Sequence, residues 1–266
     1  MNIMQTGAGA LIREWRQRRR MSQLDLALEA EISQRHLSFV ESGRSAPSRD
    51  MVLRLADQLS VPLRQRNRML AAAGFAPIYG ERALDDPVLR PALAAVELVL
   101  KGHEPYPAIA VDRGWNMVLA NRALAPLLAG VEEPALLDPP VNVLRLSLHP
   151  KGLAPRIANL DEWRAHLIER LRIQIEATAD PALEALDKEL SVYPGRPRGN
   201  GRSYDAAANI AVPLRLRVDG KVLSFISTIT VFGTPLDVTL SELAVESFFP
   251  ADAQTGEALR RLVNLA

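Results

Sequence analysis

The sequence predicts a multidomain protein, in which an all-α bundle of five helices precedes an α+β domain with a five-stranded antiparallel sheet. At 266 residues the chain exceeds one typical domain, and its 48% hydrophobic content is ample for more than one core. Apolar residues recur at helical spacing up to Gly74, whereas strand-like alternation begins only after residue 105. We therefore expect domains at residues 1–75 and 87–266, joined by a linker at residues 76–86 that contains proline and glycine.

Charge is unevenly distributed, although the formal net charge is only +1. Residues 1–75 hold 12 arginines and 7 acidic residues, whereas the remainder holds 20 basic and 24 acidic residues. A basic domain attached to a mildly acidic one is typical of a module that faces phosphate groups. Arginine suits bidentate contacts, although a codon bias would enrich it equally.

Composition disfavours several classes of protein. The chain has no cysteine, which excludes disulfides and thiolate metal sites. Its four histidines lack metal-ligand spacing and no serine lies in a nucleophile-elbow sequence, so we expect no metal, no cofactor and no enzyme activity. The first residues lack a basic leader, and the uncharged stretch 222–236 is too short and polar for a bilayer. We expect a cytoplasmic protein without membrane contact.

The first expected helix runs from Gly9 to Arg20. Leu11, Ile12 and Trp15 recur at helical spacing and should face the core. The arginines of the sequence REWRQRRR then lie largely outward, where they either form an ordinary solvated face or contact phosphate.

Two short helices joined by a tight turn are expected between Met21 and Ser48. Ser22 and Asp25 form a capping-box-like pair at the start of the first, with an apolar stripe formed by Leu24, Ala27 and Leu28. Ser33 caps the second. Its inward residues are Leu37 and Val40, and its outward residues are Gln34, Arg35, His36 and Ser38. Helices at 49–59 and 62–73, the last ended by Gly74, complete the bundle.

The second domain mixes helices and strands. We expect helices at 87–101, from Asn121 to Ala129, from Asp161 to Ala177 and from Asp180 onward, with a structured loop at 134–155. Strands at 108–111 and 115–120 flank Asp112-Arg113-Gly114, and strands at 210–218 and 223–231 flank Asp219-Gly220, a strong hairpin signal. A last strand at 240–248 precedes a short helix.

The first domain resembles the helix-turn-helix of lambda-repressor-like (XRE-type) DNA-binding domains. The resemblance runs from about Gly9 to Gly74 and is carried by Ser22-Gln23, Leu26-Ala27, Ile32-Ser33, Leu37-Ser38, Glu41-Ser42-Gly43 and Pro47-Ser48. Glu31 departs from it, because this family often has glycine at the turn; a left-handed residue other than glycine costs about 1 kcal/mol there. The resemblance also implies a buried ion pair between Arg16 and Glu41.

Base-reading candidates follow from the spacing at the start of the second of these two helices. Gln34 has the amide geometry for adenine, Arg35 the fork for guanine, Ser38 lies one turn later, and Phe39 offers an apolar face for a thymine methyl group. The alternative roles are core packing for Phe39 and simple exposure for His36. The resemblance places Gln23 and Arg44 at phosphates. One helix reads only a few base pairs, so we expect a homodimer on an inverted repeat of double-stranded DNA.

The second domain resembles the MmyB-like ligand-binding domain, a PAS-like fold, over about residues 87–262. The matching segments are 108–121, Asn142-Val-Leu-Arg145, His149-Pro150 and 248–252. This resemblance implies a pocket for a small apolar, fatty-acid-like effector. According to this resemblance, Trp115 and Phe232 form walls of the pocket. Asn121, Arg145 and His149 then bind the polar end of the effector. The alternatives are a helix cap for Asn121, core packing for Trp115 and a loop role for His149.

Two functions of different class follow. One is a transcription regulator that responds to an effector. The other is a DNA-binding protein whose C-terminal domain only dimerises or recruits a partner.

Overall fold

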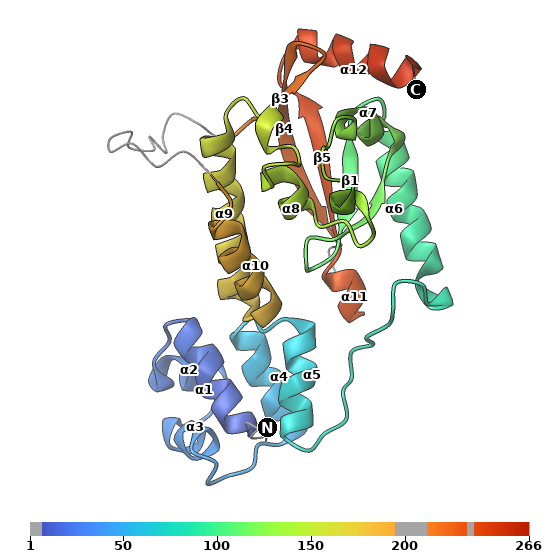
Figure 1. The fold of residues 1–266 in the computed structure, drawn as a ribbon. Coiled ribbons are helices and arrows are strands. Elements are labelled where there is room, and N and C mark those ends of the chain that lie inside the picture. The colour runs from blue at the N-terminus through green and yellow to red at the C-terminus, as the bar shows by residue number, and fades with distance from the viewer. Residues whose placement is uncertain (1–6, 195–211, 233–236, 266) are drawn as a thin grey trace. The chain divides into compact units, whose positions relative to one another are not determined.

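The computed structural model describes residues 7–194, 212–232 and 237–265. The chain forms two compact units (Figure 1). The first contains residues 1–83 together with 234–241, and the second contains residues 84–233 and 242–266. The sequence had placed residues 234–241 in the C-terminal domain.

Five helices form the first unit's bundle, as expected. They are α1 (Ala8–Arg18), α2 (Gln23–Glu29), α3 (Gln34–Glu41), α4 (Arg49–Gln58) and α5 (Leu63–Ala72). The expected caps are confirmed: the Ser22 hydroxyl accepts from the Asp25 amide at 3.1 Å, the Asp25 carboxylate accepts from the Ser22 amide at 3.0 Å, and Ser33 caps α3. Glu31 has φ of 54°, so the turn between α2 and α3 is left-handed without a glycine.

The core of the first unit differs from the expectation at α2. Ile12, Trp15, Leu37 and Val40 are buried as expected. Leu24 and Leu28, however, are 51% and 69% exposed, so the predicted stripe is wrong. The buried residues of α2 and its cap are Leu26, Ala27 and Ala30. The helix is only seven residues long, and its packing against α3 and α4 selects a face that its short pattern did not fix.

Gly9 lets α1 approach α3 very closely. A Cβ atom built on Gly9 would lie 2.0 Å from the carbonyl oxygen of Val40, which is backbone and cannot move aside easily. Glycine is therefore required here by the close contact of two helices rather than by a turn.

The short helix α11 (Val238–Ser241) belongs to the first unit although it lies between two strands of the second. The Val238 amide donates to the Gly80 carbonyl at 2.7 Å, and the Arg82 guanidinium binds the Asp237 carboxylate at 2.7 Å. Val238 is fully buried and α11 contacts α5. The segment is thus part of the packing of the helical unit.

The second unit contains the expected five-stranded antiparallel sheet. Its strands are β1 (Ala108–Val111), β2 (Met117–Ala120), β3 (Leu214–Val218), β4 (Lys221–Val231) and β5 (Ala244–Pro250), in the order β2-β1-β5-β4-β3. Asp219 and Gly220 both have positive φ and form the two-residue turn of the β3–β4 hairpin.

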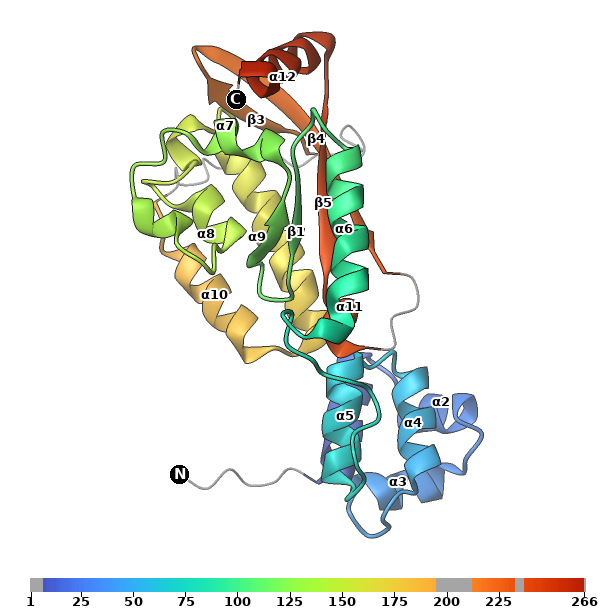
Figure 2. The ribbon, with the colours of Figure 1, turned by 90° about the vertical axis from the view of Figure 1, so that its right-hand side faces the viewer.

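Helices cover both faces of this sheet (Figure 2). One face packs on α6 (Arg90–Gly102), through Val96 and Leu100 against Ala108 and Ala110. The other carries the larger core, in which Leu216 and Phe225 of the sheet meet Leu167 of α9 (Leu160–Thr178). The remaining helices of this unit are α7 (Ala125–Leu128), α8 (Val143–Leu148), α10 (Pro181–Ser191) and α12 (Ala253–Leu265).

Several sequence-based boundaries need correction. The expected loop at 134–155 contains α8, which Asn142 caps by accepting from the Arg145 amide at 3.1 Å. The strand expected from 115 begins at Met117, because Trp115 has φ of 65° and lies in the β1–β2 loop. The strand expected from 240 begins at Ala244, since Leu240 lies in α11. The N-cap of α9 is Asn159 rather than Asp161.

The expected start of a strand at Ile210 lies outside the described residues.

Candidate functional site

The exposed face of α3 presents the predicted base-reading side chains. Gln34 and Arg35, at the N-terminal end of the helix, are exposed, and Ser38 and Phe39, one turn later, are partly exposed. Leu37 and Val40 anchor the opposite face in the core. An amide and a guanidinium at the start of an exposed helix have the geometry needed to reach base edges in the major groove.

Phe39 organises two arginines of this surface. The guanidinium of Arg35 lies 5.4 Å from the centroid of the Phe39 ring, and that of Arg44 lies 5.8 Å from it. The Arg44 amide also donates to the Phe39 carbonyl at 2.8 Å. Cations within about 6 Å of an aromatic face are attracted to it. Phe39 is thus neither a core residue nor fully exposed, and it orders a base-reading candidate and a phosphate-binding candidate together.

The ion pair expected between Arg16 and Glu41 is present. Arg16 donates from Nε to Glu41 Oε1 at 2.6 Å and from Nη2 to Oε2 at 2.9 Å, and both residues are buried. Gln23, a phosphate-binding candidate, donates its side-chain amide to the same carboxylate at 2.8 Å. Burial acts to raise the pKa of Glu41, but the hydrogen bonds from Arg16 and Gln23 outweigh it and hold this pKa below its usual value. A network connecting α1, α2 and α3 therefore supports the start of α2.

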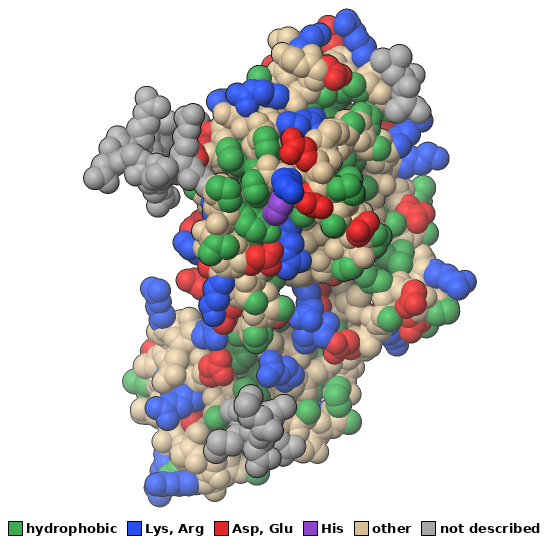
Figure 3. Space-filling view, in the orientation of Figure 1, with side chains coloured by type: hydrophobic (Ala, Val, Ile, Leu, Met, Phe, Trp, Pro, Cys, Tyr) green, Lys and Arg blue, Asp and Glu red, His purple; other side chains and the backbone are tan. Residues whose placement is uncertain are grey.

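Positive charge is available on the surface of the first unit. Arg13, Arg20, Arg44 and Arg49 are exposed. Figure 3 shows several arginine side chains (blue) on the surface of the first unit, which contains no lysine. Such cations contact the phosphate backbone without reading sequence.

The second unit contains a small apolar cavity of about 90 Å³, between the sheet face and helices α8 and α9. Its lining is mostly aliphatic and aromatic, with two polar groups, Glu246 and Ser147. The Ser147 hydroxyl accepts from the indole of Trp163 at 3.0 Å. Glu246, on β5, is 5% exposed and pairs with Arg170 of α9 at 3.0 Å. An apolar space with few convergent polar groups is typical of a ligand site.

Of the five predicted ligand-binding residues, Trp115 lines this cavity. Asn121 makes structural hydrogen bonds: its Oδ1 accepts from the Ala108 amide at 3.1 Å, and its Nδ2 donates to the carbonyls of Leu100 and Tyr106. It does not cap the following helix with its side chain. Phe232 lines a separate groove beside α6. Neither residue is among those that line the cavity.

Arg145 and His149 lie together elsewhere, at the junction of α8 and α10. Arg145 forms a bidentate pair with Glu189 at 2.7 and 2.8 Å, and the His149 ring meets the Tyr193 ring edge to face. Burial, together with a hydrogen bond to Glu189, raises the pKa of Tyr193 to about 12. The two residues are joined in one cluster, and their role in ligand binding stays a prediction.

Arg170, Gln174 and Glu246 were missed by the sequence analysis. A second hollow, a surface groove of about 320 Å³, is lined by all three together with Trp115. The i, i+4 spacing of Arg170 and Gln174 places them on one face of α9, but only the fold brings β5 opposite that face. The sequence spacing of Arg170 and Gln174 alone was therefore not enough to predict that they line a groove with Glu246.

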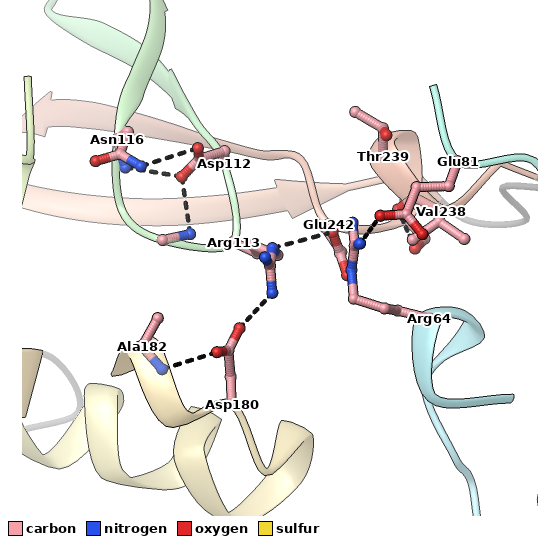
Figure 4. Close-up of polar contacts among 12 residues, drawn as sticks. Arg64, Glu81, Asp112, Arg113, Asn116, Asp180, Ala182, Val238, Thr239 and Glu242 are labelled. Carbon is pink, nitrogen blue, oxygen red and sulfur yellow. Dashed lines mark hydrogen bonds and ion pairs between the residues drawn. The ribbon is translucent and has the colours of Figure 1, made fainter. Parts of the chain in front are cut away.

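The loop that carries Trp115 is held by many polar contacts. The Asp112 carboxylate accepts from the amides of Gly114 and Asn116 at 2.8 and 2.9 Å, and Arg113 binds Asp180 and Glu242 (Figure 4). This arrangement fixes the backbone around the cavity wall.

A helix-turn-helix bundle with an exposed recognition helix, followed by an α+β domain with an apolar cavity, defines a DNA-binding transcription regulator with a ligand-binding domain. Family models support both parts: a helix-turn-helix model matches residues 12–65, and the MmyB-like transcription regulator ligand binding domain matches residues 92–262. The chain belongs to the MmyB-like transcription regulators. No curated protein matches it. Among the described helices, none has both the length and the apolar content needed to cross a bilayer.

Proposed function

We propose that this regulator recognises an inverted-repeat operator as a homodimer and that a small apolar, fatty-acid-like effector bound in the second unit controls this recognition. The observation that carries the DNA-binding part is the exposure of Gln34 and Arg35 on α3, opposite the buried Leu37 and Val40. Gln34, Arg35, Ser38 and Phe39 contact bases in this proposal, and Gln23 and Arg44 contact phosphates.

Selection of duplexes from a random pool gives the operator, and binding to it is then measured between 50 and 200 mM salt, a range over which ~6–10 phosphate contacts cost roughly 10³–10⁵ in affinity. We expect a steep loss of affinity for the selected duplex and a recovered sequence with two-fold symmetry. A flat salt response would contradict phosphate-driven binding, and a sequence without two-fold symmetry would contradict the dimer arrangement.

The effector part is supported by the family and by the apolar lining of the cavity around Trp115. An effector changes DNA binding only if it binds the DNA-competent and DNA-incompetent states with unequal affinity. Native mass spectrometry of the purified protein tests this part: we expect a bound small amphiphile, and its removal should change the affinity for the operator.

A second candidate function is favoured by the small volume of the cavity, about 90 Å³ against roughly 300–1,000 Å³ for most ligand sites. In this candidate, the second unit only dimerises or recruits a partner. A protein that stays free of small molecules and binds no amphiphile supplied to it would support that role.

A further inference from the structure

Two hollows in the second unit meet at one wall. The apolar cavity and the surface groove have separate linings that share two residues, Trp115 and Glu246. The cavity side consists mainly of aliphatic residues of α8 and the sheet, and the groove side includes Ile173 and Ile229, which are 58% and 49% exposed. Trp115 and Glu246 therefore lie between the two hollows and contribute to the wall of each.

The cavity by itself is too small for an effector. An apolar cavity of roughly 150 Å³ holds benzene, whereas this one measures about 90 Å³. The adjoining groove provides about 320 Å³, and a space that includes both falls in the range of ligand sites. Movement of the shared wall would join them without any rearrangement of the sheet.

The backbone on both sides of Trp115 is fixed, so its side chain is the part that can move. The Val143 amide donates to the Trp115 carbonyl at 2.9 Å, and Asn142 donates its side-chain amide to the Gly114 carbonyl at 2.7 Å. The polar contacts of the indole are with α9: its Nε1 donates to Gln174 Oε1 at 2.7 Å, and the Arg170 guanidinium lies 4.8 Å from its ring centroid. The ring also packs in the larger core, where Trp115 is 7% exposed. Rotation toward the groove breaks the hydrogen bond and the cation–π contact, and the space of the groove gives the ring room to turn.

Arg170 also has unused hydrogen-bonding capacity. Within the described part of the chain, Arg170 donates one hydrogen bond, from Nη1 to Glu246 Oε1 at 3.0 Å, whereas a guanidinium has five N–H donors. Burial and the nearby Arg170 lower the pKa of His166, one turn earlier on α9, so this histidine adds no positive charge at neutral pH. Asp112 and Glu242 also line the groove, but Asp112 accepts three hydrogen bonds within its loop and Glu242 pairs with Arg113. Among the described residues that line the groove, Arg170 is thus the one cation.

We propose that the effector site spans both hollows, with the Trp115 side chain as a movable wall: the chain of a single-chain amphiphile occupies the cavity, and its anionic end binds Arg170 in the groove. The pair between Arg170 and Glu246 stays intact, because the ligand uses other N–H groups of the same guanidinium. This inference rests on the proposed effector function, and it replaces Arg145 and His149 by Arg170 as the group that receives the polar end.

The movable wall is tested with decanoate as the probe and isothermal titration of the full chain. Gln174→Leu removes the hydrogen bond from the indole and also the one from Gln174 Nε2 to the Arg113 carbonyl at 2.9 Å. Both losses raise the fraction of protein with the wall open, so we expect decanoate to bind about fivefold more tightly. Glu176→Leu, on the exposed side of α9, is the matched control and should leave the affinity unchanged. Equal affinities for wild type and Gln174→Leu would overturn the movable wall.

The anionic end is tested by comparing decanoate with decan-1-ol. The double variant Arg170→Gln/Glu246→Gln removes both charges and leaves no buried charge without a partner. We expect the preference for the acid over the alcohol to fall about tenfold, the loss typical of one charge-assisted hydrogen bond. Arg172→Gln, an exposed arginine of the same helix, serves as control. An unchanged preference in the double variant would overturn the role of Arg170.

A cavity-filling variant separates this inference from the proposed function. Val143 lines the cavity and does not line the groove, so Val143→Phe should block the chain while leaving Arg170 in place. If Val143→Phe abolishes decanoate binding while the Gln174 and Arg170 variants leave it unaltered, that result would support an effector in the cavity and refute the shared wall. Absence of binding in every protein, wild type included, would contradict the apolar effector as well.

Discussion

Phe39 contacts one residue with a proposed base-reading role, Arg35, and one with a proposed phosphate-binding role, Arg44. Arg35 and Arg44 both lie against this ring, yet Arg35 belongs to the start of the recognition helix, and Arg44 follows its end. A guanidinium directed at a base edge distinguishes sequences, whereas one directed at a phosphate does not. The two arginines therefore have distinguishable consequences when they are replaced.

Arg35→Ala should reduce discrimination at one base pair by about 1–3 kcal/mol and leave binding to non-specific DNA nearly unchanged. Arg44→Ala should weaken binding to all duplexes and lower the salt dependence by about one phosphate contact. Gln34→Ala should reduce discrimination by a similar amount, but at a different base pair from Arg35→Ala. Competition binding with single-base variants of the selected operator measures these effects, and a uniform loss in Arg35→Ala would argue against base reading.

Glu41 links pH to the stability of the bundle. Its pKa in the folded protein lies below its usual value of 4.5, because hydrogen bonds from Arg16 and Gln23 outweigh the effect of burial. A lowered folded pKa means that the stabilisation is fully present above pH 4.5 and is lost as pH falls through the folded value. The ion pair should consequently contribute to the free energy of unfolding at neutral pH and contribute little in acid.

Glu41→Gln should therefore lower the free energy of unfolding by about 3 kcal/mol at pH 7, because it leaves the Arg16 charge without its partner. The difference from wild type should shrink below pH 4.5, where Glu41 in the wild type also becomes protonated. Urea unfolding at pH 7 and pH 3 measures the two differences. A difference that stays constant with pH would show that Glu41 acts through packing alone.

At the scale of elements, the approach of α1 to α3 depends on one missing side chain. Gly9 lies against the Val40 carbonyl, and the same pair of helices is joined by Arg16 and Glu41 farther along. The position of the recognition helix is thus set at two points along α1. A change at either point should disturb both stability and DNA contact.

Gly9→Ala should destabilise the protein by about 1–3 kcal/mol, since the new methyl group must displace backbone. On propensity alone the substitution would be favourable, because glycine is a poor helix former. Gly7→Ala is the matched control, as a Cβ there meets nothing within 4 Å. Thermal unfolding of the two variants gives the comparison, and equal stability would mean that α1 shifts without cost.

At the scale of the whole molecule, residues 237–241, which lie in the chain between β4 and β5, pack within the helical unit. Asp237 is 6% exposed; it binds Arg82 and also accepts from the amides of Thr239 and Leu240, which caps α11. Strand β5, which carries Glu246 of the cavity wall, begins three residues after α11 ends. The ligand-binding sheet is therefore joined covalently to the DNA-binding unit at a second place, in addition to the linker that follows α5.

Asp237→Ala should loosen this attachment and destabilise the helical unit by about 1–3 kcal/mol, because Arg82 and the start of α11 lose their acceptor. Hydrogen exchange should rise at residues 78–82 and in α5. Asp86→Ala is a suitable control, since Asp86 is a partly exposed cap near the start of the second unit, where its carboxylate accepts from the Val88 amide at 2.8 Å. Unchanged exchange in Asp237→Ala would show that the segment contributes nothing to the helical unit.

The sequence by itself determined the helical bundle, its caps and the two hairpins. These features depend on local signals: Ser22 and Asp25 satisfy amides three residues away, and Asp219-Gly220 adopts the left-handed turn that a hairpin needs. The ion pair between Arg16 and Glu41 was expected from the resemblance to a known family. Local chemistry and family likeness were sufficient for the fold class and for the face of α3.

Only the tertiary structure decided the buried face of α2, the place of α11 and the composition of the cavity wall. Leu24 and Leu28 are exposed because packing against two other helices, not the pattern of seven residues, selects the buried side. Arg170 and Glu246 lie 76 residues apart and meet because β5 lies opposite α9. A pocket is formed by side chains from distant segments, so its lining depends on how those segments pack, which no local pattern encodes.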